Sequence, residues 1–218
     1  MAHVIWDWNG TLFDDLPIVV EAVNACLRSQ GVSPIDQETY RSRFVRPLNG
    51  FYELLLGRPV DDDLMLELDH VFQDAYREGF DDADLNSEAS AAIRSVADSG
   101  ATQSIVSMLW HDMLVPTVSG FGLDGFMLAL DGNRGSAGET KDQHMVHHVG
   151  RLRQVYPELA GQTMTVIGDI IDDAAAARAA EVRCVLYDGG SQPRRVLERQ
   201  GVPVVDSLLD AVAIAIGV

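Results

Sequence analysis

The hydrophobic positions of the chain follow one pattern after residue 85. Short apolar runs there alternate with segments whose apolar residues recur at helical spacing. We expect strands at 102–107, 126–130, 163–167, 182–187 and 204–205, and helices at 87–99, 111–120, 139–155, 172–180, 192–200 and 207–216. Since a parallel pair of strands needs a crossover, usually a helix, this alternation predicts an α/β fold with a doubly wound parallel sheet.

The chain before residue 85 has a different pattern. Residues 4–6 form an apolar run that we expect to be a buried strand, because β-branched and aromatic side chains suit a pleated surface. Residues 16–30 have helical spacing and end before Gly31. The stretch 33–80 lacks a β-branched run, and we expect helices from Ser33 through Phe44, at 49–56 and at 61–79.

This change of pattern predicts two domains. A helical insert at 16–84 would interrupt an α/β core made of 1–15 and 85–218, with the acidic run 81–84 as a linker.

The net charge of the chain limits the classes of partner that it can bind. Among 218 residues, 33 are acidic and 16 basic, which gives a net charge of -17. Such a surface repels nucleic-acid backbones, so we expect no nucleic-acid partner. An anionic substrate would need a metal ion to approach a carboxylate site.

The cysteines and the apolar segments indicate the compartment. Cys26 and Cys184 make no disulfide framework and are expected to be small buried core residues. We expect no secretory signal, and the apolar segment 208–218 is too short to cross a bilayer. The prediction is a soluble, cytoplasmic protein without a membrane partner, either a monomer or a homodimer.

The first candidate site residue follows the first strand. Asp7 ends the apolar run, and Asn9, Gly10 and Thr11 follow it. Ligands of α/β sheets sit at the carboxyl ends of strands, so Asp7 suits a nucleophile or a metal ligand that faces a phosphate. The alternative is a solvated aspartate before an Asn-Gly hairpin turn.

Three further polar groups follow later strands. Ser107 closes the apolar run at 105–106, Lys141 starts a helix after the glycine-rich loop 132–138, and Asp169 follows the run ending at Gly168, with Asp172 and Asp173 close behind. Taken singly, Ser107 could be an ordinary hydroxyl at a strand end and Lys141 a surface lysine. Asp172 and Asp173 could simply interact with the positive end of the dipole of the following helix. Together, their order and chemistry fit phosphoryl transfer.

These four motifs resemble those of the haloacid dehalogenase superfamily, in particular phosphoglycolate-phosphatase-like members with a helical cap inserted after the first strand. The resemblance covers essentially the whole chain and implies a phosphatase that acts through an aspartyl-phosphate on Asp7. It also implies a magnesium ion held by Asp7, the backbone carbonyl of Asn9 and Asp169. Asp173, or alternatively Asp172, would support Asp169 or a water that binds the metal.

The resemblance also implies how substrate is held. Lys141 would neutralise charge near Asp7, and Ser107 would donate to a phosphoryl oxygen. Free N–H groups between Trp8 and Thr11 would cradle the phosphoryl group, and substrate binding is assigned to Gly10, Thr11, Ser107 and Met108.

One position departs from the family pattern. Asn9 stands where these phosphatases usually have an aspartate that protonates the leaving oxygen and then activates water. General acid–base catalysis contributes about 10²- to 10⁴-fold in rate. Three interpretations follow: another donor or a good leaving group replaces the acid, Asn9 deamidates to aspartate, or the protein is a weak or inactive relative that binds a phosphorylated ligand.

The substrate is expected to be a small phosphorylated metabolite, because a cap that closes over a site excludes proteins. Arg46 is our candidate for a second anionic group on the substrate, against the alternative of a surface arginine. Among the histidines, His111 follows Ser107 and is a minor candidate for the missing proton donor. His147 and His148 are adjacent on a helix and cannot face the same site.

Overall fold

The computed structural model describes residues 2–135 and 140–217, and its chain forms two compact units. Met1–Phe13 and Leu85–Val218 make the core unit, and Asp14–Asp84 makes the helical unit. The chain passes between them at β2 (Phe13–Asp14) and β3 (Asp84–Leu85), which pair in a two-stranded sheet. Within the described residues, no helix is both long and apolar enough to traverse a lipid bilayer.

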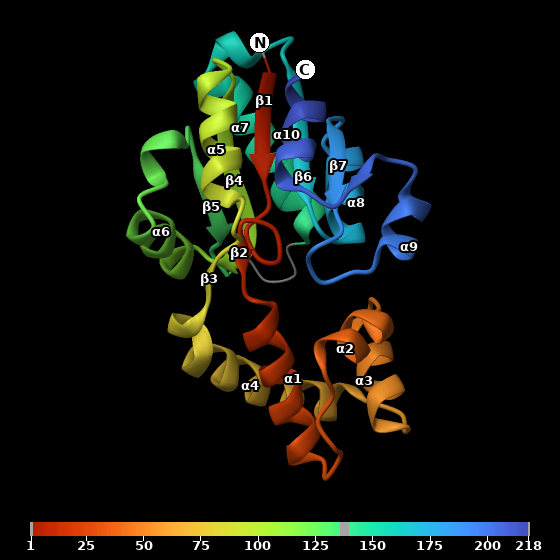
Figure 1. Ribbon diagram of the computed structural model, residues 1–218. Coiled ribbons are helices and arrows are strands. Elements are labelled where there is room, and N and C mark those ends of the chain that lie inside the picture. Colours follow the sequence, from red (N-terminus) through yellow and green to blue (C-terminus); the bar gives the residue numbers. More distant parts are fainter. Residues whose placement is uncertain (1, 136–139, 218) are drawn as a thin grey trace. The chain divides into compact units, whose positions relative to one another are not determined.

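The core unit is built on a parallel sheet of six strands in the order β5-β4-β1-β6-β7-β8. This confirms the predicted parallel α/β fold. The strands are β1 (Ala2–Trp6), β4 (Thr102–Trp110), β5 (Leu130–Asn133), β6 (Thr163–Gly168), β7 (Arg183–Tyr187) and β8 (Val204–Val205). Because all of them run in one direction, their carboxyl ends share one edge of the sheet, as the arrows in Figure 1 show.

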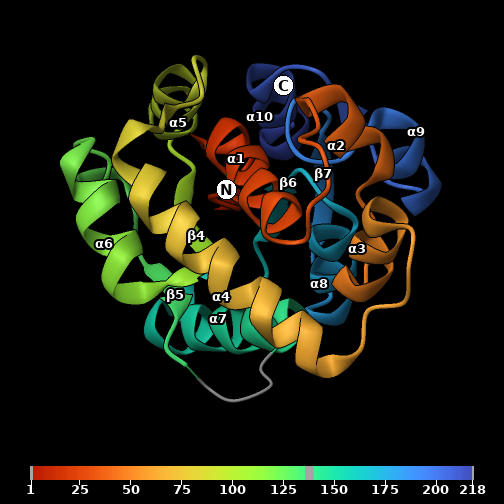
Figure 2. The same ribbon diagram turned by 90° about the horizontal axis from the view of Figure 1, so that it is seen from below.

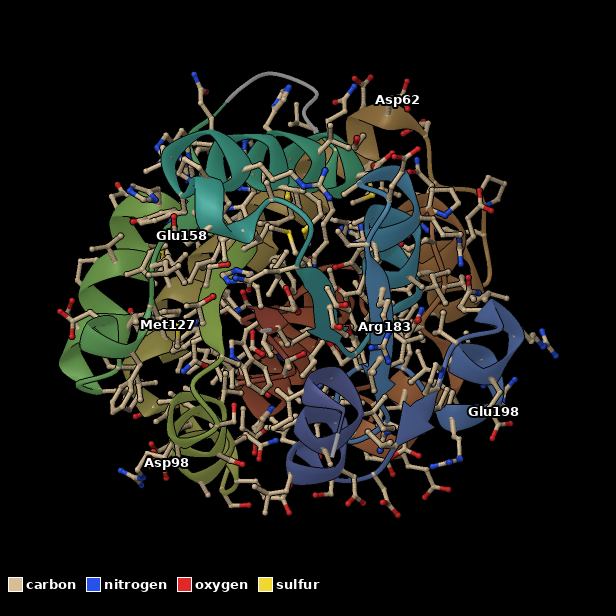
Figure 3. The ribbon with its side chains drawn as sticks, turned by 90° about the horizontal axis from the view of Figure 1, so that it is seen from above. Asp62, Asp98, Met127, Glu158, Arg183 and Glu198 are labelled. Carbon is tan, nitrogen blue, oxygen red and sulfur yellow. The ribbon has the colours of Figure 1, made fainter. Side chains whose placement is uncertain are left out.

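Helices cover both faces of this sheet. α5 (Ala89–Asp98) and α10 (Leu208–Ile216) lie on one face, and α7 (Lys141–Val155) and α8 (Ile171–Ala179) on the other (Figures 1 and 3). Figure 3 looks along the strands, with Arg183 at the start of β7. The core unit is completed by α6 (His111–Gly120), α9 (Arg194–Leu197) and the short 3₁₀ helices Asp124–Phe126, Pro157–Leu159 and Glu198–Gln200.

The apolar core explains why β1 is the central strand. Val4, Ile5 and Trp6 are all fully buried, which requires packing on both faces of the strand. A continuous cluster joins Ile5 with Val166 of β6 and with apolar residues of α7 and α8. Cys26 and Cys184 are free and buried, as predicted.

Two predicted strands were placed wrongly. Instead of a strand at 126–130, a 3₁₀ turn ends at Phe126 and β5 begins at Leu130. β5 was missed because it contains Asp131, which is buried through polar partners and not through an apolar pattern. β4 runs on to Trp110, so Ser107 lies within a strand and not at its end, near a shift in the β4–β5 register. Residues 136–139, which comprise the end of the predicted glycine-rich loop and the first residue of the predicted helix at 139–155, lie outside the described residues.

The helical unit contains α1 (Leu16–Ser29), α2 (Gln37–Arg43), α3 (Leu48–Leu56), α4 (Asp62–Gly79) and the 3₁₀ turn Phe80–Asp82. α1 and α4 lie side by side (Figure 2). Asp61 caps α4 by accepting from Leu64 N at 2.9 Å, and Tyr76 Oη donates to the buried Asp15 carboxylate at 2.8 Å. The absence of a β-branched run therefore predicted the helical character of this segment correctly.

Candidate active site

Asp7 directly follows the central strand and continues its pairing. Its backbone N–H donates to Ile167 O of β6 at 2.8 Å, and its side chain is only 4% exposed. The rigid sheet therefore holds this carboxylate at the edge where ligands of α/β proteins bind.

The loop after Asp7 folds back on itself. Gly10 N donates to Phe13 O at 2.9 Å, and Thr11 N donates to Trp8 O at 3.2 Å. These two N–H groups already have acceptors, so the prediction of free donors is wrong for them. Substrate binding by Gly10 and Thr11 stays a prediction.

The side chain of Asp169, the residue after β6, is enclosed by two segments, 10–11 and 190–191. Its Oδ2 accepts from Ser191 N at 2.6 Å, and its Oδ1 accepts from Thr11 Oγ1 at 3.4 Å. A Cβ on Gly10 would lie 2.5 Å from Asp169 Oδ2, and one on Gly190 would lie 2.3 Å from the same atom. Only glycine fits at these two positions, and Gly10 also has the left-handed φ of +75° that favours it.

Asp173 and Lys141 complete the cluster. Asp173 is fully buried in the first turn of α8, and its Oδ2 accepts from Asp169 N and Ile170 N, both at 3.0 Å. Lys141 Nζ lies 2.6 Å from Asp7 Oδ1 and 2.5 Å from Asp173 Oδ1. One ammonium group therefore connects the carboxylates that follow β1 and β6.

The electrostatics of this cluster favour a bound cation. Burial raises the pKa of Asp7 well above its usual range; Lys141 opposes this, while Asp173 and Asp169 add to it. Burial alone would lower the pKa of Lys141, but Asp173 and Asp7 hold it above its usual range. Three carboxylates share one ammonium, so negative charge is left over.

The same carboxylates fit a divalent metal. Oxygen atoms of Asp7, Asp169 and Asp173 lie within 4.8 Å of one another, and all three residues are buried. Hard oxygen ligands of this kind suit Mg²⁺. Asp172, the alternative to Asp173, is half-buried, and among the described residues it is not one of the carboxylates grouped closely enough to share a metal ion.

Ser107 and Asn9 contact each other. Ser107 Oγ donates to Asn9 Oδ1 at 3.1 Å and accepts from Leu109 N at 3.0 Å. Deamidation would require Gly10 N to attack the Asn9 side chain. That attack would disturb both the Ser107 contact and the Gly10–Phe13 hydrogen bond, so the structure favours an intact Asn9.

The other predicted site residues lie elsewhere. Met108 is half-buried in β4. Arg46 belongs to the helical unit, where it is exposed with Cζ 5.9 Å from the centre of the Phe44 ring. His111 Nδ1 accepts from Gly132 N at 3.2 Å, and its Nε2 lies 3.1 Å from Arg134 Nη2. His147 is exposed and its neighbour His148 is buried, in agreement with the prediction that the two cannot face the same site.

Sequence reasoning missed the support for Asp169. Gly190 and Ser191 follow β7, and the Gly189-Gly190 pair after an apolar strand was the available signal. It also missed Asp131 and its buried partners, because no short motif marks them.

The fold and this acidic cluster define a family that the sequence comparison also finds. Residues 4–187 match the model of the haloacid dehalogenase-like hydrolases, so the chain belongs to that family. The predicted resemblance and the hydrolase class are thereby confirmed.

Individual relatives agree with this assignment. The chain is 25% identical to a phosphoglycolate phosphatase of Nitrosospira multiformis, with 95% of this chain and 92% of that protein covered. It is 22% identical to phosphoglycolate phosphatase 1 of Pseudomonas aeruginosa, over 95% of this chain and 77% of that one. A haloacid dehalogenase-like protein of Streptococcus pneumoniae, 18% identical, shares the fold with a TM-score of 0.79 over 98% of both chains.

Proposed function

We propose that this chain is a magnesium-dependent phosphatase that hydrolyses a small phosphorylated metabolite through an aspartyl-phosphate on Asp7. The observation that carries the proposal is the position of Lys141 Nζ, 2.6 Å from Asp7 Oδ1 and 2.5 Å from Asp173 Oδ1. This buried charge arrangement suits the transfer of a phosphoryl group, for which positioning and charge stabilisation supply most of the catalysis.

The residues have separate tasks in this reaction. The Asp7 carboxylate attacks phosphorus, and the bond between phosphorus and the leaving oxygen breaks. Lys141 favours the ionised form of Asp7 and offsets charge on the transferring group. Water then attacks the phosphoryl group and releases phosphate from Asp7.

The magnesium ion would be held by Asp7, Asp169 and the backbone carbonyl of Asn9, and would offset the charge of the phosphate. Asp173 has another task, since its Oδ2 accepts two backbone N–H groups and its Oδ1 pairs with Lys141. It would support the site by holding the Asp169 backbone and the ammonium group in place.

The substrate is proposed from the relatives and the helical unit. The named relatives are phosphoglycolate phosphatases, and phosphoglycolate carries a carboxylate besides its phosphate. The helical unit would serve as a cap, and Arg46 would recognise a second anionic group of this kind. We further propose that the protein acts in the cytoplasm as a monomer or homodimer.

The test is a panel of phosphorylated metabolites that includes phosphoglycolate, assayed with magnesium and with a chelator. We expect phosphate release that is lost on chelation and lost in Asp7→Asn, because the amide is not a nucleophile for phosphorus. Magnesium-dependent turnover that survives Asp7→Asn would overturn the mechanism.

A second function is favoured by Asn9 alone. An amide cannot exchange a proton usefully at neutral pH, so the chain could bind a phosphorylated ligand without turnover. The same panel distinguishes the two functions, because magnesium-dependent binding without phosphate release would support a ligand-binding protein.

A further inference from the structure

A chain of hydrogen-bonded side chains connects β1, β4, β5 and α7 inside the core unit. The links are Thr102 Oγ1 to His3 Nδ1 (2.7 Å), His3 Nε2 to Ser104 Oγ (2.9 Å), Ser104 Oγ to His148 Nε2 (2.8 Å) and His148 Nδ1 to Asp131 Oδ2 (3.1 Å). His3, Ser104 and His148 are fully buried, and Asp131 is 4% exposed. Nothing in the proposed phosphatase reaction uses these groups directly.

The positions of the protons follow from the ionised end of the chain. Burial alone would raise the pKa of Asp131, but hydrogen bonds from His148 and Arg134 hold it below its usual range. An ionised Asp131 only accepts, so His148 Nδ1 donates and its Nε2 accepts from the Ser104 hydroxyl. By the same logic His3 Nε2 donates to Ser104, and its Nδ1 accepts from Thr102. Each link then has one donor and one acceptor.

The segment Ser104–His148–Asp131 has the residue types of a nucleophilic triad. Ser104 and His148 are both 0% exposed, so no substrate can reach the hydroxyl. The hydrogen-bonded side chains therefore hold in place the strands and the helix that they join.

Those elements include the helix that carries Lys141. Lys141, His144 and His148 are three and four residues apart and thus share one face of α7. His144 Nε2 lies 3.2 Å from Asp131 O, and His148 contacts the Asp131 carboxylate. Arg151 of the same helix donates to that carboxylate at 2.8 Å. One residue of β5 therefore anchors successive turns of α7.

We propose that Asp131 and His148 are positioning residues that hold α7 in register against β5 and β4, and thereby hold the Lys141 ammonium against Asp7 and Asp173. Neither residue contacts the proposed reacting atoms, so they act through Lys141. A displacement of a catalytic group by about 1 Å can lower the rate by about 10²-fold. The kinetic part of this inference rests on the proposed phosphatase function.

The sequence offers a direct probe, since Lys141 is the only lysine among the 16 lysines and arginines. Lysine labelled with ¹³C at Cε therefore gives one side-chain NMR signal, which reports on Lys141 at fixed pH without magnesium or substrate. We expect His148→Phe, which removes both hydrogen bonds of the ring, to shift or broaden this signal. Asp131→Asn retains an acceptor for His148 but loses the ion pairs with Arg134 and Arg151, so we expect a smaller change in the same direction.

The control is Val149→Ala on the same helix. Val149 is 2% exposed in the apolar core cluster, so its truncation loosens packing without touching the polar chain. We expect the lysine signal of this variant to stay at the wild-type position. In an active enzyme, His148→Phe should lower kcat by about 10²-fold with a much smaller change in KM, because the lost interaction acts in the transition state.

A wild-type lysine signal in folded His148→Phe and Asp131→Asn would overturn the inference, as would an equal shift in Val149→Ala. If His148→Phe does not fold, Asp131→Asn alone decides. If the wild-type protein hydrolyses no phosphate ester, the proposed function fails while the lysine signal still tests the positioning role.

Discussion

At the scale of single residues, Asn9 is the position that would govern departure of the leaving group in the proposed reaction. It is half-buried, and its side-chain oxygen accepts from Ser107. The amide can stabilise charge but cannot supply a proton, so an alkyl leaving group must depart without this help. The leaving groups of acyl and aryl phosphates, a carboxylate and a phenolate, depart readily as anions and need this proton less.

We therefore expect Asn9→Asp to raise kcat for an alkyl phosphate by about 10²- to 10⁴-fold, and to raise it much less for an aryl phosphate. Steady-state kinetics with one substrate of each kind measures the difference. Asn9→Ala is the control, since it has neither charge nor proton. Peptide mass spectrometry should find an intact Asn9 in the wild type. An equal response of both substrates to Asn9→Asp would contradict the acid–base argument.

Gly10 is a second position to test, because it has a φ of +75° and a Cβ added there would lie 2.5 Å from Asp169 Oδ2. We expect Gly10→Ala to lower the free energy of unfolding by about 1–3 kcal/mol, because alanine is strained at this φ. The variant should also lose magnesium-dependent activity, because the added Cβ displaces Asp169. Gly100→Ala is a matched control with a φ of +77° and nothing within 4 Å of its Cβ. It should lose stability but keep activity, and the two effects are separated by denaturant unfolding and a phosphatase assay. Equal activity in both variants would exclude the clash as a functional constraint.

At the scale of elements, the sequence was informative wherever burial is apolar. The strand at 4–6 and the helix at 111–120 were predicted from periodicity and are present in the structure. The same reasoning failed for β5, because Asp131 is buried by hydrogen bonds and ion pairs with His148 and Arg151, which are distant in the sequence. Asp7, Asp169 and Lys141 could be found because strand ends and short motifs mark them. Ser191 could not, since its contribution is a backbone N–H that any residue provides.

The buried histidine on β1 predicts how stability depends on pH. Burial, with a smaller contribution from His148, lowers the pKa of His3 to about 4. In the unfolded chain a histidine has a pKa of about 6.5, so the unfolded state binds more protons between these values. The contribution of neutral His3 to the free energy of unfolding is therefore fully present above about pH 6.5. It is lost as pH falls toward 4, by about 3 kcal/mol in total.

We expect His3→Gln to flatten this pH dependence, because the amide retains a polar group but does not titrate in this range. The measurement is urea unfolding at a series of pH values between 4 and 7. His70→Gln is the control, since His70 is exposed on α4. A slope in His3→Gln equal to that of the wild type would assign the acid sensitivity to other groups.

At the scale of the whole molecule, two kinds of negative charge must be distinguished. The net charge of -17 is spread over the chain, and any salt screens its self-repulsion. The carboxylates of Asp7, Asp169 and Asp173 are buried together with one ammonium group, and bulk ions screen such a cluster much less. A specific magnesium site should therefore stabilise the fold beyond the effect of ionic strength.

We expect magnesium at 100 times its Kd to stabilise the protein by about 2.7 kcal/mol, since it binds the folded state and not the unfolded chain. Thermal melting with magnesium, compared with potassium chloride of equal ionic strength plus a chelator, isolates this effect. Asp169→Asn keeps the side-chain size but removes one carboxylate, so its melting temperature should respond equally to the two salts. Because this measurement needs no substrate, it separates the metal site from the choice of phosphorylated metabolite. If the melting temperature of the wild type also responded equally to both salts, the acidic cluster would not be a magnesium site. Its carboxylates would then serve only to hold the Lys141 ammonium group between Asp7 and Asp173.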